Sequence, residues 1–431
     1  MRLALTLAAL LAFPFVHAQD AAVDRPFEAH WQSTYLRQTK PAFASPYAGP
    51  KSLGGARAVS YSFTSTMYVG VRAGEGLELY YNPELTQGVS FSQLLGVAGF
   101  TNGELIRTSG SDPSLYTARF FARKTWNFGG ALEEQASDQN QVRTSYAAER
   151  FVLTAGTVSV LDVFDAVDYS RDARTQFMNW SSLTYGAWDF PADARGYTRG
   201  VAAEYISPAY SLRAGRFALP SQSNGLALDN RVGAHFGDVA EVELPFKLRG
   251  RDAALRVMAS RNRAVMGAFS DAIAAGGVPD VGVVRKLQSK SGLGTGIQAE
   301  LAEHVGAYVR AAWNDGKTET FAFTEIDRSF SVGVLGKGER WSRSGDSAGL
   351  ALYLNGLGSA HRNYLAAGGQ GFFLGEGRLN YGTEKILEAF YSLHLGARVW
   401  VSGGYQRIGN PGYNQDRGPT SFYSLRLHTN F

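Results

Sequence analysis

Apolar and polar residues alternate along this chain in short segments. Residues 59–64 read Val, Ser, Tyr, Ser, Phe, Thr, and residues 77–82 read Leu, Glu, Leu, Tyr, Tyr, Asn. Successive side chains of a strand point to opposite faces, so this pattern predicts strands with one apolar and one polar face. Such segments of about ten residues recur between Gly, Asn, Asp and Pro, with no linker or fixed repeat to divide the chain.

The final segment is the most informative of these. From Tyr423 onward one face carries Tyr, Leu, Leu, Thr and Phe431, while the other carries Ser, Arg, His and Asn. A soluble sheet also shows this alternation. A chain that stops on the aromatic residue of such a strand is typical of the closing strand of an outer-membrane barrel.

The number of segments predicts the size of the barrel. Besides the segments at 59, 77 and 423, further ones begin at residues 115, 151, 201, 210, 239, 255, 294, 305, 348, 384 and 397. Two more lie near Trp31 and Phe330, and residues 372–381 are ambiguous, which gives sixteen or seventeen. Because bacterial barrels favour even numbers, we expect an all-β, transmembrane antiparallel β-barrel of about 16 strands. Barrels of this size leave an aqueous channel, so transport is the expected function.

The N-terminus predicts export. Arg2 precedes a short apolar run over residues 3–16, and Val16-His17-Ala18 resembles a signal-peptidase site. We therefore assign residues 1–18 to a signal peptide and residues 19–431 to a single barrel domain. A retained anchor is the alternative, but the run is short for a membrane-spanning helix. About ten residues separate the signal from the first strand, which leaves no room for the plug of an energy-coupled receptor.

Composition excludes several other classes. The chain has no Cys, which excludes disulfides and thiolate metal sites, and its formal net charge of +4 argues against a nucleic-acid-binding surface. The histidines are scattered, the glycine-rich strings lack a nucleotide-binding context, and no G-x-S-x-G elbow is present, so we expect no metal, no cofactor and no enzyme activity. An acidic run (Asp162, Asp165, Asp168 and Asp172) leaves open a Ca²⁺ site or, in preference, a loop paired with arginines.

The polar face of each strand should line the channel, because Arg or Lys on the lipid face near the midplane costs about 2–4 kcal/mol. In the segment from Leu115 this places Tyr116, Ala118, Phe120 and Ala122 toward lipid. The strand residues that we expect in the lumen are Arg119, Arg123, Arg256, Arg310, Glu78 and Glu204.

Three stretches are too long for turns: residues 82–114, 162–195 and 269–291. Long loops on a rigid scaffold often carry function, and these either fold toward the pore or remain solvated outside. The loop residues that we expect to contact a solute are Trp180, Trp188 and Arg195. With the strand residues they would orient and hydrogen-bond a hydrated sugar, unless they only pair and hydrate the wall.

Several motifs resemble those of the OprB-like family of carbohydrate-selective porins. They are residues 30–35, 41–43, 47–53, 81–88, 102–104, 174–180, 186–187, 193–197, 379–382, 405–406 and 410–419. The resemblance implies a sixteen-stranded barrel in the outer membrane of a Gram-negative cell. It also implies facilitated diffusion of monosaccharides such as glucose through a narrow eyelet of Arg and Glu. A general or carboxylate-preferring porin is the alternative, and an outer-membrane enzyme is a more distant one.

The same class implies the partners. These are sugar solutes, outer-membrane lipid and lipopolysaccharide, and the barrel-assembly machinery that reads the terminal strand with Phe431. Monomer and homotrimer both remain open, because lipid-facing and subunit-facing surfaces are alike apolar.

Overall fold

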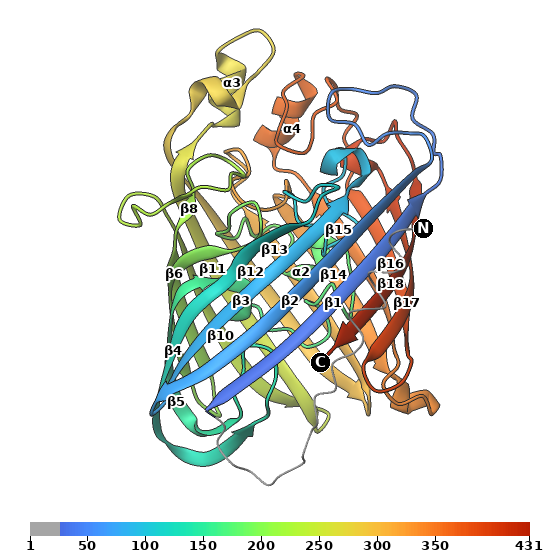
Figure 1. The fold of residues 1–431 in the computed structure, drawn as a ribbon. Coiled ribbons are helices and arrows are strands. Elements are labelled where there is room, and N and C mark those ends of the chain that lie inside the picture. The colour runs from blue at the N-terminus through green and yellow to red at the C-terminus, as the bar shows by residue number, and fades with distance from the viewer. Residues whose placement is uncertain (1–25) are drawn as a thin grey trace.

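The computed structural model describes residues 26–431, so the predicted signal peptide at residues 1–18 lies outside the described residues. Within that range sixteen strands form a closed antiparallel barrel (Figure 1). The wall is built from β1 (Phe27–Lys40), β2 (Ala58–Gly74), β3 (Leu77–Val89), β4 (Ser114–Gln135), β5 (Thr144–Val158), β6 (Thr198–Ile206), β7 (Ser211–Phe217), β10 (Phe236–Leu248), β11 (Arg251–Met266), β12 (Lys286–Ala302), β13 (Val305–Asn314), β14 (Arg328–Lys337), β15 (Ser347–Gly356), β16 (Glu384–His394), β17 (Val399–Gly409) and β18 (Thr420–Asn430). The predicted fold class and strand number are confirmed.

The first and last strands close the barrel. β1 pairs antiparallel with β18 from Gln32 opposite Asn430 to Thr39 opposite Tyr423. At the end of this seam the Phe431 amide donates to the Trp31 carbonyl (2.8 Å) and the Trp31 amide donates to the Phe431 carbonyl (2.9 Å). The two rings stack with 5.1 Å between centroids. The terminal aromatic residue therefore completes the closed hydrogen-bond ladder that a bilayer demands.

Side chains alternate between the two faces of the wall as the sequence predicts. On β12 and β13, Leu293 and Trp313 are exposed on the outside, whereas Tyr308 and Arg310 on the inside are 1% exposed. The outer face of β10 presents Val242 and the apolar positions that follow it.

A bulge between β3 and β4 corrects two expectations. The segment that the sequence ends at Asn82 continues as β3 through Pro83 to Val89, and the strand register shifts between Asn82 and Pro83. The shift reverses the alternation on β4 before Arg119, so Tyr116 turns into the lumen and Ala118 is fully buried instead of facing lipid. A bulge inserts one extra residue, which is why period-two counting fails there.

The two ends of the barrel differ in loop length. At the end where β1 begins and β18 finishes, which we call the inner rim, the described strands are joined by turns as short as residues 75–76 and 249–250. At the opposite end, the outer rim, the connections are residues 41–57, 90–113, 159–197, 218–235, 267–285, 315–327, 357–383 and 410–419. Residues 372–381 belong to one of these loops and not to a strand, and β12 already begins at Lys286 within the expected loop 269–291.

The outer loops contain most of the short regular elements of the described chain. These are α2 (Trp180–Leu183), α3 (Phe269–Ala274), α4 (Ser359–Ala366), the hairpin of β8 (Leu219–Pro220) with β9 (Leu228–Asp229), and the 3₁₀ helices η1 (Phe91–Leu94), η2 (Val160–Asp162), η3 (Val281–Val284) and η5 (Pro411–Tyr413). The 3₁₀ helix η4 (Gly338–Trp341) lies in an inner-rim turn. In Figure 1, α3 and α4 stand above the rim while α2 lies within the barrel. None of the helices in residues 26–431 is long and apolar enough to cross a membrane.

Candidate pore constriction

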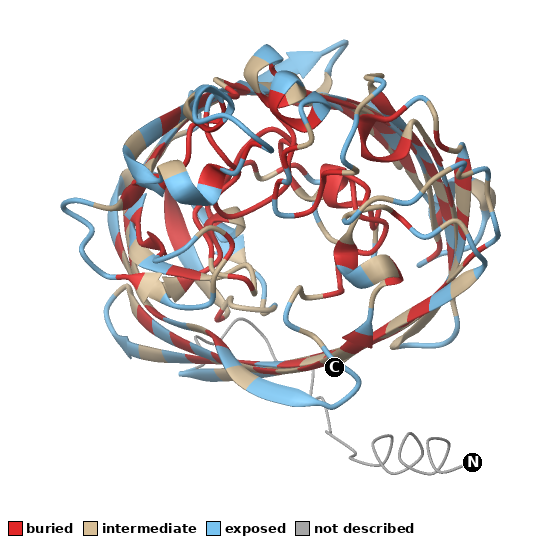
Figure 2. Ribbon diagram, turned by 90° about the horizontal axis from the view of Figure 1, so that it is seen from above, coloured by how far each residue is buried: buried red, intermediate tan, exposed pale blue. Residues whose placement is uncertain are grey.

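The loop between β5 and β6, residues 159–197, enters the barrel, and we call it the constriction loop. Inward side chains of the wall hold its backbone. Glu388 on β16 accepts hydrogen bonds from the amides of Met178 (2.6 Å) and Asn179 (3.2 Å). Arg426 on β18 donates to the carbonyl of Ala173 (2.7 Å). Seen from above, buried loop segments lie inside the ring of strands (Figure 2).

Arg310 is a further fully buried anchor of this loop. Its guanidinium lies 2.9 Å from the carboxylate of Asp165, and the two side chains are 1% and 0% exposed. Further hydrogen bonds reach the carbonyls of Ser170 (2.7 Å) and Ser182 (3.0 Å). Burial raises the pKa of Asp165, and the neighbouring Arg310 opposes that rise. Arg310 thus faces inward as predicted, but the loop covers it.

A second loop, residues 90–113, packs against the constriction loop. The amide of Trp180 donates to the carbonyl of Phe100 (2.8 Å), and the amide of Gly103 donates to the carbonyl of Met178 (2.6 Å). On the wall, Glu384 accepts from the amide of Gly99 (2.8 Å). The two loops therefore form one ordered body inside the barrel.

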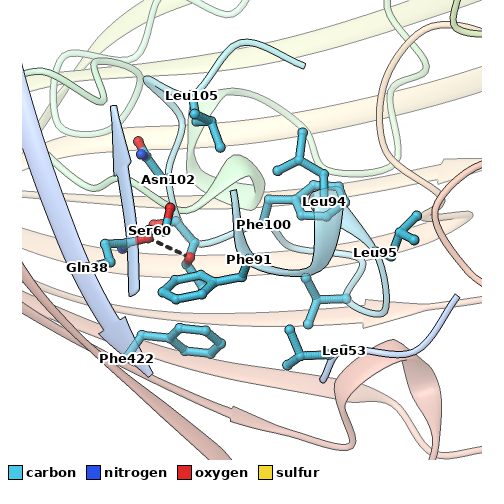
Figure 3. A pocket seen from close by; sticks show the side chains of 12 residues that line it. Gln38, Leu53, Ser60, Phe91, Leu94, Leu95, Phe100, Asn102, Leu105 and Phe422 are labelled. Carbon is cyan, nitrogen blue, oxygen red and sulfur yellow. Dashed lines mark hydrogen bonds between the residues drawn. The ribbon is translucent and has the colours of Figure 1, made fainter. Parts of the chain in front are cut away.

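Figure 3 shows the contact of the second loop with the wall, where the rings of Phe91 and Phe422 lie 5.3 Å apart. Leu94, Leu105 and Phe100 line the same small cavity, which has a volume of about 20 Å³. Such a volume holds about one water molecule. The cavity is a packing feature and has no room for a sugar.

Charged and aromatic side chains gather where β2, β3 and β4 face the two loops. We call this group the charged cluster, and its members are Tyr68, Glu84, Glu104, Tyr116, Arg119, Asp162, Arg174, Arg195 and Tyr197.

Arg174 of the constriction loop joins the two most buried acids of the cluster. Its guanidinium lies 2.9 Å from Glu84 on β3 and 2.9 Å from Glu104 on the second loop. It also donates to the hydroxyl of Tyr68 (3.0 Å). The side chains of Arg174, Glu84 and Glu104 are 13%, 1% and 10% exposed. Burial raises the pKa of Glu104, and Arg174 holds that rise in check.

Arg119, Asp162 and Tyr197 form a second part of the cluster, in which Asp162 is the most exposed of the three carboxylates. Arg119 makes a bidentate pair with Asp162 (2.7 Å for each contact), and the two side chains are 14% and 27% exposed. The guanidinium lies 5.1 Å from the ring centre of Tyr197, whose hydroxyl donates to Glu84 (3.1 Å). These partly exposed groups combine charged hydrogen-bonding atoms with an aromatic ring.

Arg195 completes the group from the end of the constriction loop. Its guanidinium lies 4.4 Å from the ring centre of Tyr116, and the hydroxyl of Tyr116 donates to Glu84. The Nε of Arg195 is buried without a hydrogen-bond partner among the described protein atoms. Three arginines therefore face three carboxylates in the cluster, and the formal charges balance.

Comparisons with known proteins agree with this architecture. Residues 51–431 match the family model described as carbohydrate-selective porin, OprB family. The chain belongs to the OprB family of carbohydrate-selective porins. A search of curated proteins finds no match for the sequence.

Solved structures of an OprB porin share the fold of this family member. The high-pH structure of Pseudomonas putida OprB has a TM-score of 0.69 at 13% identity, and 94% of each chain is covered. The low-pH structure of the same protein has a TM-score of 0.51 at 10% identity, covering 94% of this chain and 93% of the other. At such identities the similarity concerns the fold alone.

Two of the residues expected in this OprB-family lumen lie nearer the inner rim. Glu78 accepts hydrogen bonds from the hydroxyls of Tyr80 (2.7 Å) and Tyr146 (2.6 Å). Arg123 lies 5.1 Å from the ring centre of Tyr80 and donates to the carbonyl of Asn140 in the turn between β4 and β5 (3.1 Å). Both face inward but do not contact the charged cluster through any of these bonds.

Arg256 and Glu204 belong to a separate network on β6, β7, β10 and β11. Arg213, which was not among the expected site residues, is its centre, with Glu204 at 3.1 Å, Glu241 at 3.0 Å and Glu243 at 2.8 Å. Arg256 pairs with Glu243 (3.1 Å). The arginines and carboxylates of this network therefore pair with one another along the wall.

The two tryptophans are packed among apolar residues. Trp188 is 2% exposed and Trp180 is 9% exposed. The ring of Trp180 stacks on Phe323 at 5.5 Å, and its Nε1 donates to the carbonyl of Asn102 (3.0 Å). Neither ring presents a free face, so we do not propose either as a sugar-stacking platform.

Among the expected site residues, only Arg119 and Arg195 meet in the charged cluster. Glu84 was not among the expected site residues, because Asn82-Pro83 was interpreted as the end of a strand. Glu84 is six residues after Glu78 and therefore faces the same side of β3. Continuing the alternation through Pro83 would have found it. Arg174 and Tyr197 lie on a long loop, where no periodicity indicates direction.

The acidic run of the constriction loop is engaged by side chains of the wall. Asp162 pairs with Arg119, Asp165 with Arg310, and Asp168 accepts from Gln298 (2.7 Å). Within residues 26–431, no three His, Asp or Glu side chains gather in a way that suits a metal ion. Two of the four aspartates, Asp162 and Asp165, therefore have the arginine-paired arrangement.

Proposed function

We propose that the charged cluster is the selectivity constriction of this carbohydrate porin, and that monosaccharides such as glucose diffuse past it into the periplasm. The observation that carries the proposal is the balance of three arginines and three carboxylates around two tyrosines, Tyr116 and Tyr197. A sugar that enters a narrow passage loses water, and its hydroxyls need both donors and acceptors in exchange. Arginine supplies the donors, and carboxylate supplies the acceptors.

The solute-contacting groups would be Arg119, Asp162, Arg195 and Tyr197, which are partly exposed and, unlike Arg174, are not tied to two buried carboxylates. Arg119 and Asp162 hold each other in a fixed bidentate geometry, so little side-chain entropy is lost when a hydroxyl binds beside them. Arg174, whose side-chain exposure is close to that of Arg119 (13% and 14%), fixes the two loops against the wall through Glu84 and Glu104. No group here is proposed to do chemistry, because the acids are tied to arginines and hydroxyls.

A general or carboxylate-preferring pore is the second candidate. An anion pathway would require an excess of cationic groups at the narrowest point. The network around Arg213 carries two arginines against Glu204, Glu241 and Glu243, so it adds no such excess. The neutral-solute function is the better fit to these charges.

The remaining assignments follow from an outer-membrane location. We propose that residues 1–18 are the signal peptide and that residues 19–431 form the mature barrel. The terminal strand with Phe431 would be the segment that the barrel-assembly machinery recognises, and the apolar outer wall would contact lipid or, in a homotrimer, other copies.

The test is planar-bilayer conductance of the refolded protein during titration with glucose, other sugars and small carboxylates. Saturable block by sugars is expected, and replacing Arg119 with Ala should raise the conductance and weaken the block. Arg171→Ala is the control, because it removes the same charge from an exposed position of the constriction loop. Block by carboxylates alone would favour the second candidate. Unchanged conductance and unchanged block in Arg119→Ala would remove Arg119 from the site.

A further inference from the structure

Four arginines lie on the outward face of the barrel near the outer rim. Arg199, Arg216, Arg261 and Arg263 are on β6, β7 and β11, and we call them the rim arginines. Their positions alternate with lumen-facing neighbours such as Arg213 and Asn262, and they share the outward parity of Val201, Leu212 and Val257. Charges on this face are unexpected unless something compensates them.

Strand register brings the rim arginines together. Arg216 stands opposite Val201 on β6 and opposite Asp238 on β10, and Asp238 in turn stands opposite Arg261. Arg263 is two residues farther along β11 and stands opposite Phe236. The four side chains therefore occupy one continuous patch across neighbouring strands.

The patch has a large excess of positive charge. Arg216 is neutralised by a bidentate pair with Asp238 (2.7 and 2.8 Å). Arg199 donates only to the Asn230 side chain (3.1 Å), and Arg261 donates to the hydroxyl of Ser289 (3.2 Å). Among the described residues, no carboxylate lies within ion-pairing distance of Arg199, Arg261 or Arg263.

The height of the patch on the wall matches a membrane interface. Below Asp238 every outward position of β10 is apolar: Ala240, Val242, Leu244, Phe246 and Leu248. Ten residues at about 3.4 Å each span about 34 Å along the strand. With a tilt of about 40° this is about 26 Å of height, close to the roughly 25 Å apolar band of outer-membrane barrels. The rim arginines therefore lie where the hydrocarbon ends and lipid headgroups begin.

An apolar groove adjoins the patch on the same face. Phe120 and Val201 from the wall and Val232 from the loop 218–235 line it, and Arg199 and Asn230 stand at its polar edge. Its volume is about 420 Å³. Phe120 and Val201 are 63% and 47% exposed, so the groove opens outward.

We propose that the rim arginines and this groove bind a lipid of the outer leaflet that carries two phosphates, with one phosphate on Arg199 beside the groove, the other on Arg261 and Arg263, and part of an acyl chain against Phe120 and Val201. Guanidinium groups match phosphate oxygens in charge and geometry. A second copy packed on this face by a two-fold axis would oppose arginine to arginine, which disfavours a symmetric dimer here. The inference rests on the proposed outer-membrane location but not on sugar selectivity.

The experiment measures lipid retention by the mature protein refolded in detergent, using native mass spectrometry. The probes are bisphosphorylated lipid A and its fully dephosphorylated form. The triple variant Arg199→Gln/Arg261→Gln/Arg263→Gln should bind the phosphorylated probe at least about tenfold more weakly, because charge-assisted hydrogen bonds are lost. Val232→Trp, which fills the groove, should weaken both probes.

The control triple variant, Arg249→Gln/Lys337→Gln/Arg340→Gln, removes the same charge from exposed positions at the inner rim. It should bind like the wild type, and all variants should keep wild-type conductance, so a failure of sugar selectivity would be seen separately. Equal retention of both probes by the wild type would overturn the proposal, as would equal weakening by the two triple variants. A shift of the first triple variant to a smaller oligomer without loss of lipid would assign the face to subunit contacts instead. If that variant does not fold, the salt dependence of wild-type binding decides the same question. Added salt should weaken binding of the phosphorylated probe but not of the dephosphorylated one. Binding of the phosphorylated probe that does not change with salt would refute the proposal.

Discussion

Replacing Arg174 with methionine removes the cation that joins Glu84 and Glu104 while keeping much of the side-chain volume. Arg174 lies 2.9 Å from each carboxylate, and those acids are 1% and 10% exposed. Removing one partner of a buried ion pair costs about 3–5 kcal/mol, because the remaining charge stays desolvated. The variant has three ways to relieve this cost: the loops shift, water enters, or Glu104 takes up a proton.

The electrical consequence follows from the charge balance of the cluster. With Arg174 absent, two arginines face three carboxylates, so the constriction gains a net charge of −1. A unit charge about 4 Å from a passing monovalent ion contributes about 1 kcal/mol even at the dielectric constant of water. We therefore expect the K⁺/Cl⁻ permeability ratio to rise about fivefold or more at neutral pH.

The pH dependence distinguishes this mechanism from a simple loss of structure. Burial already raises the pKa of Glu104, and Arg174 opposes that rise. Without Arg174 the Glu104 carboxyl protonates at a higher pH than in the wild type. As the pH is lowered, the variant should therefore lose its added cation preference at a pH where the permeability ratio of the wild type is still unchanged.

The assay is the reversal potential of single channels under a KCl gradient, repeated over a pH series and with glucose present. Arg171→Met is the control, because it removes the same charge from an exposed position of the same loop without releasing a buried acid. It should leave the glucose block intact. A permeability ratio and a glucose block that both stay at wild-type values in Arg174→Met would refute the reasoning.

Two further predictions concern how the loops are held. Arg310→Met should free the constriction loop from Asp165, Ser170 and Ser182 and produce larger, noisier single-channel currents, whereas quiet wild-type currents would show that Arg310 is no anchor. Glu325, which accepts from the amides of Phe373 (2.7 Å) and Leu374 (2.8 Å), has a pKa raised by burial, so its contribution to loop stability is full at low pH and is lost as the pH rises through that raised pKa. The rate of proteolysis of the outer loops should increase with pH in the wild type, and this increase should be absent in Glu325→Gln. A rate that rises with pH in Glu325→Gln as it does in the wild type would contradict the assignment.

The fold was predictable because a lipid-facing wall imposes a strict rule on the sequence. Period-two alternation located the strands near Trp31 and Phe330, and the even-number rule correctly set the total at sixteen, although it left open which segment to discard. The rule fails where the backbone departs from it. The shift at Pro83 moved Tyr116 and Ala118 to unexpected faces and left Glu84 unnoticed.

The site was less predictable because loop direction has no periodic signal. Arg119 and Arg310 have the same inward parity, yet Arg119 meets an exposed carboxylate and Arg310 is covered by the constriction loop. The loops at 315–327 and 357–383 were not anticipated either, although the first supplies the ring of Phe323 that covers Trp180. Apolar residues of different loops, such as Trp180 and Phe323, contact one another although they are far apart in the sequence. Local sequence patterns do not predict such contacts.

The barrel needs many inward charges for a reason that has little to do with solutes. Ordering each loop residue costs about 1–2 kcal/mol of backbone entropy, so a long constriction loop stays in place only if the wall offers strong contacts along its length. Glu388, Arg426 and Arg310 supply such contacts to loop amides and carbonyls. Several inward charges are therefore used as anchors, whereas Arg119 on β4 and its partner Asp162 on the constriction loop are partly exposed to a solute and anchor the loop through one ion pair. It follows that substitutions of the buried anchors should change the noise and size of the current, whereas substitution of Arg119 should also change which solute blocks it.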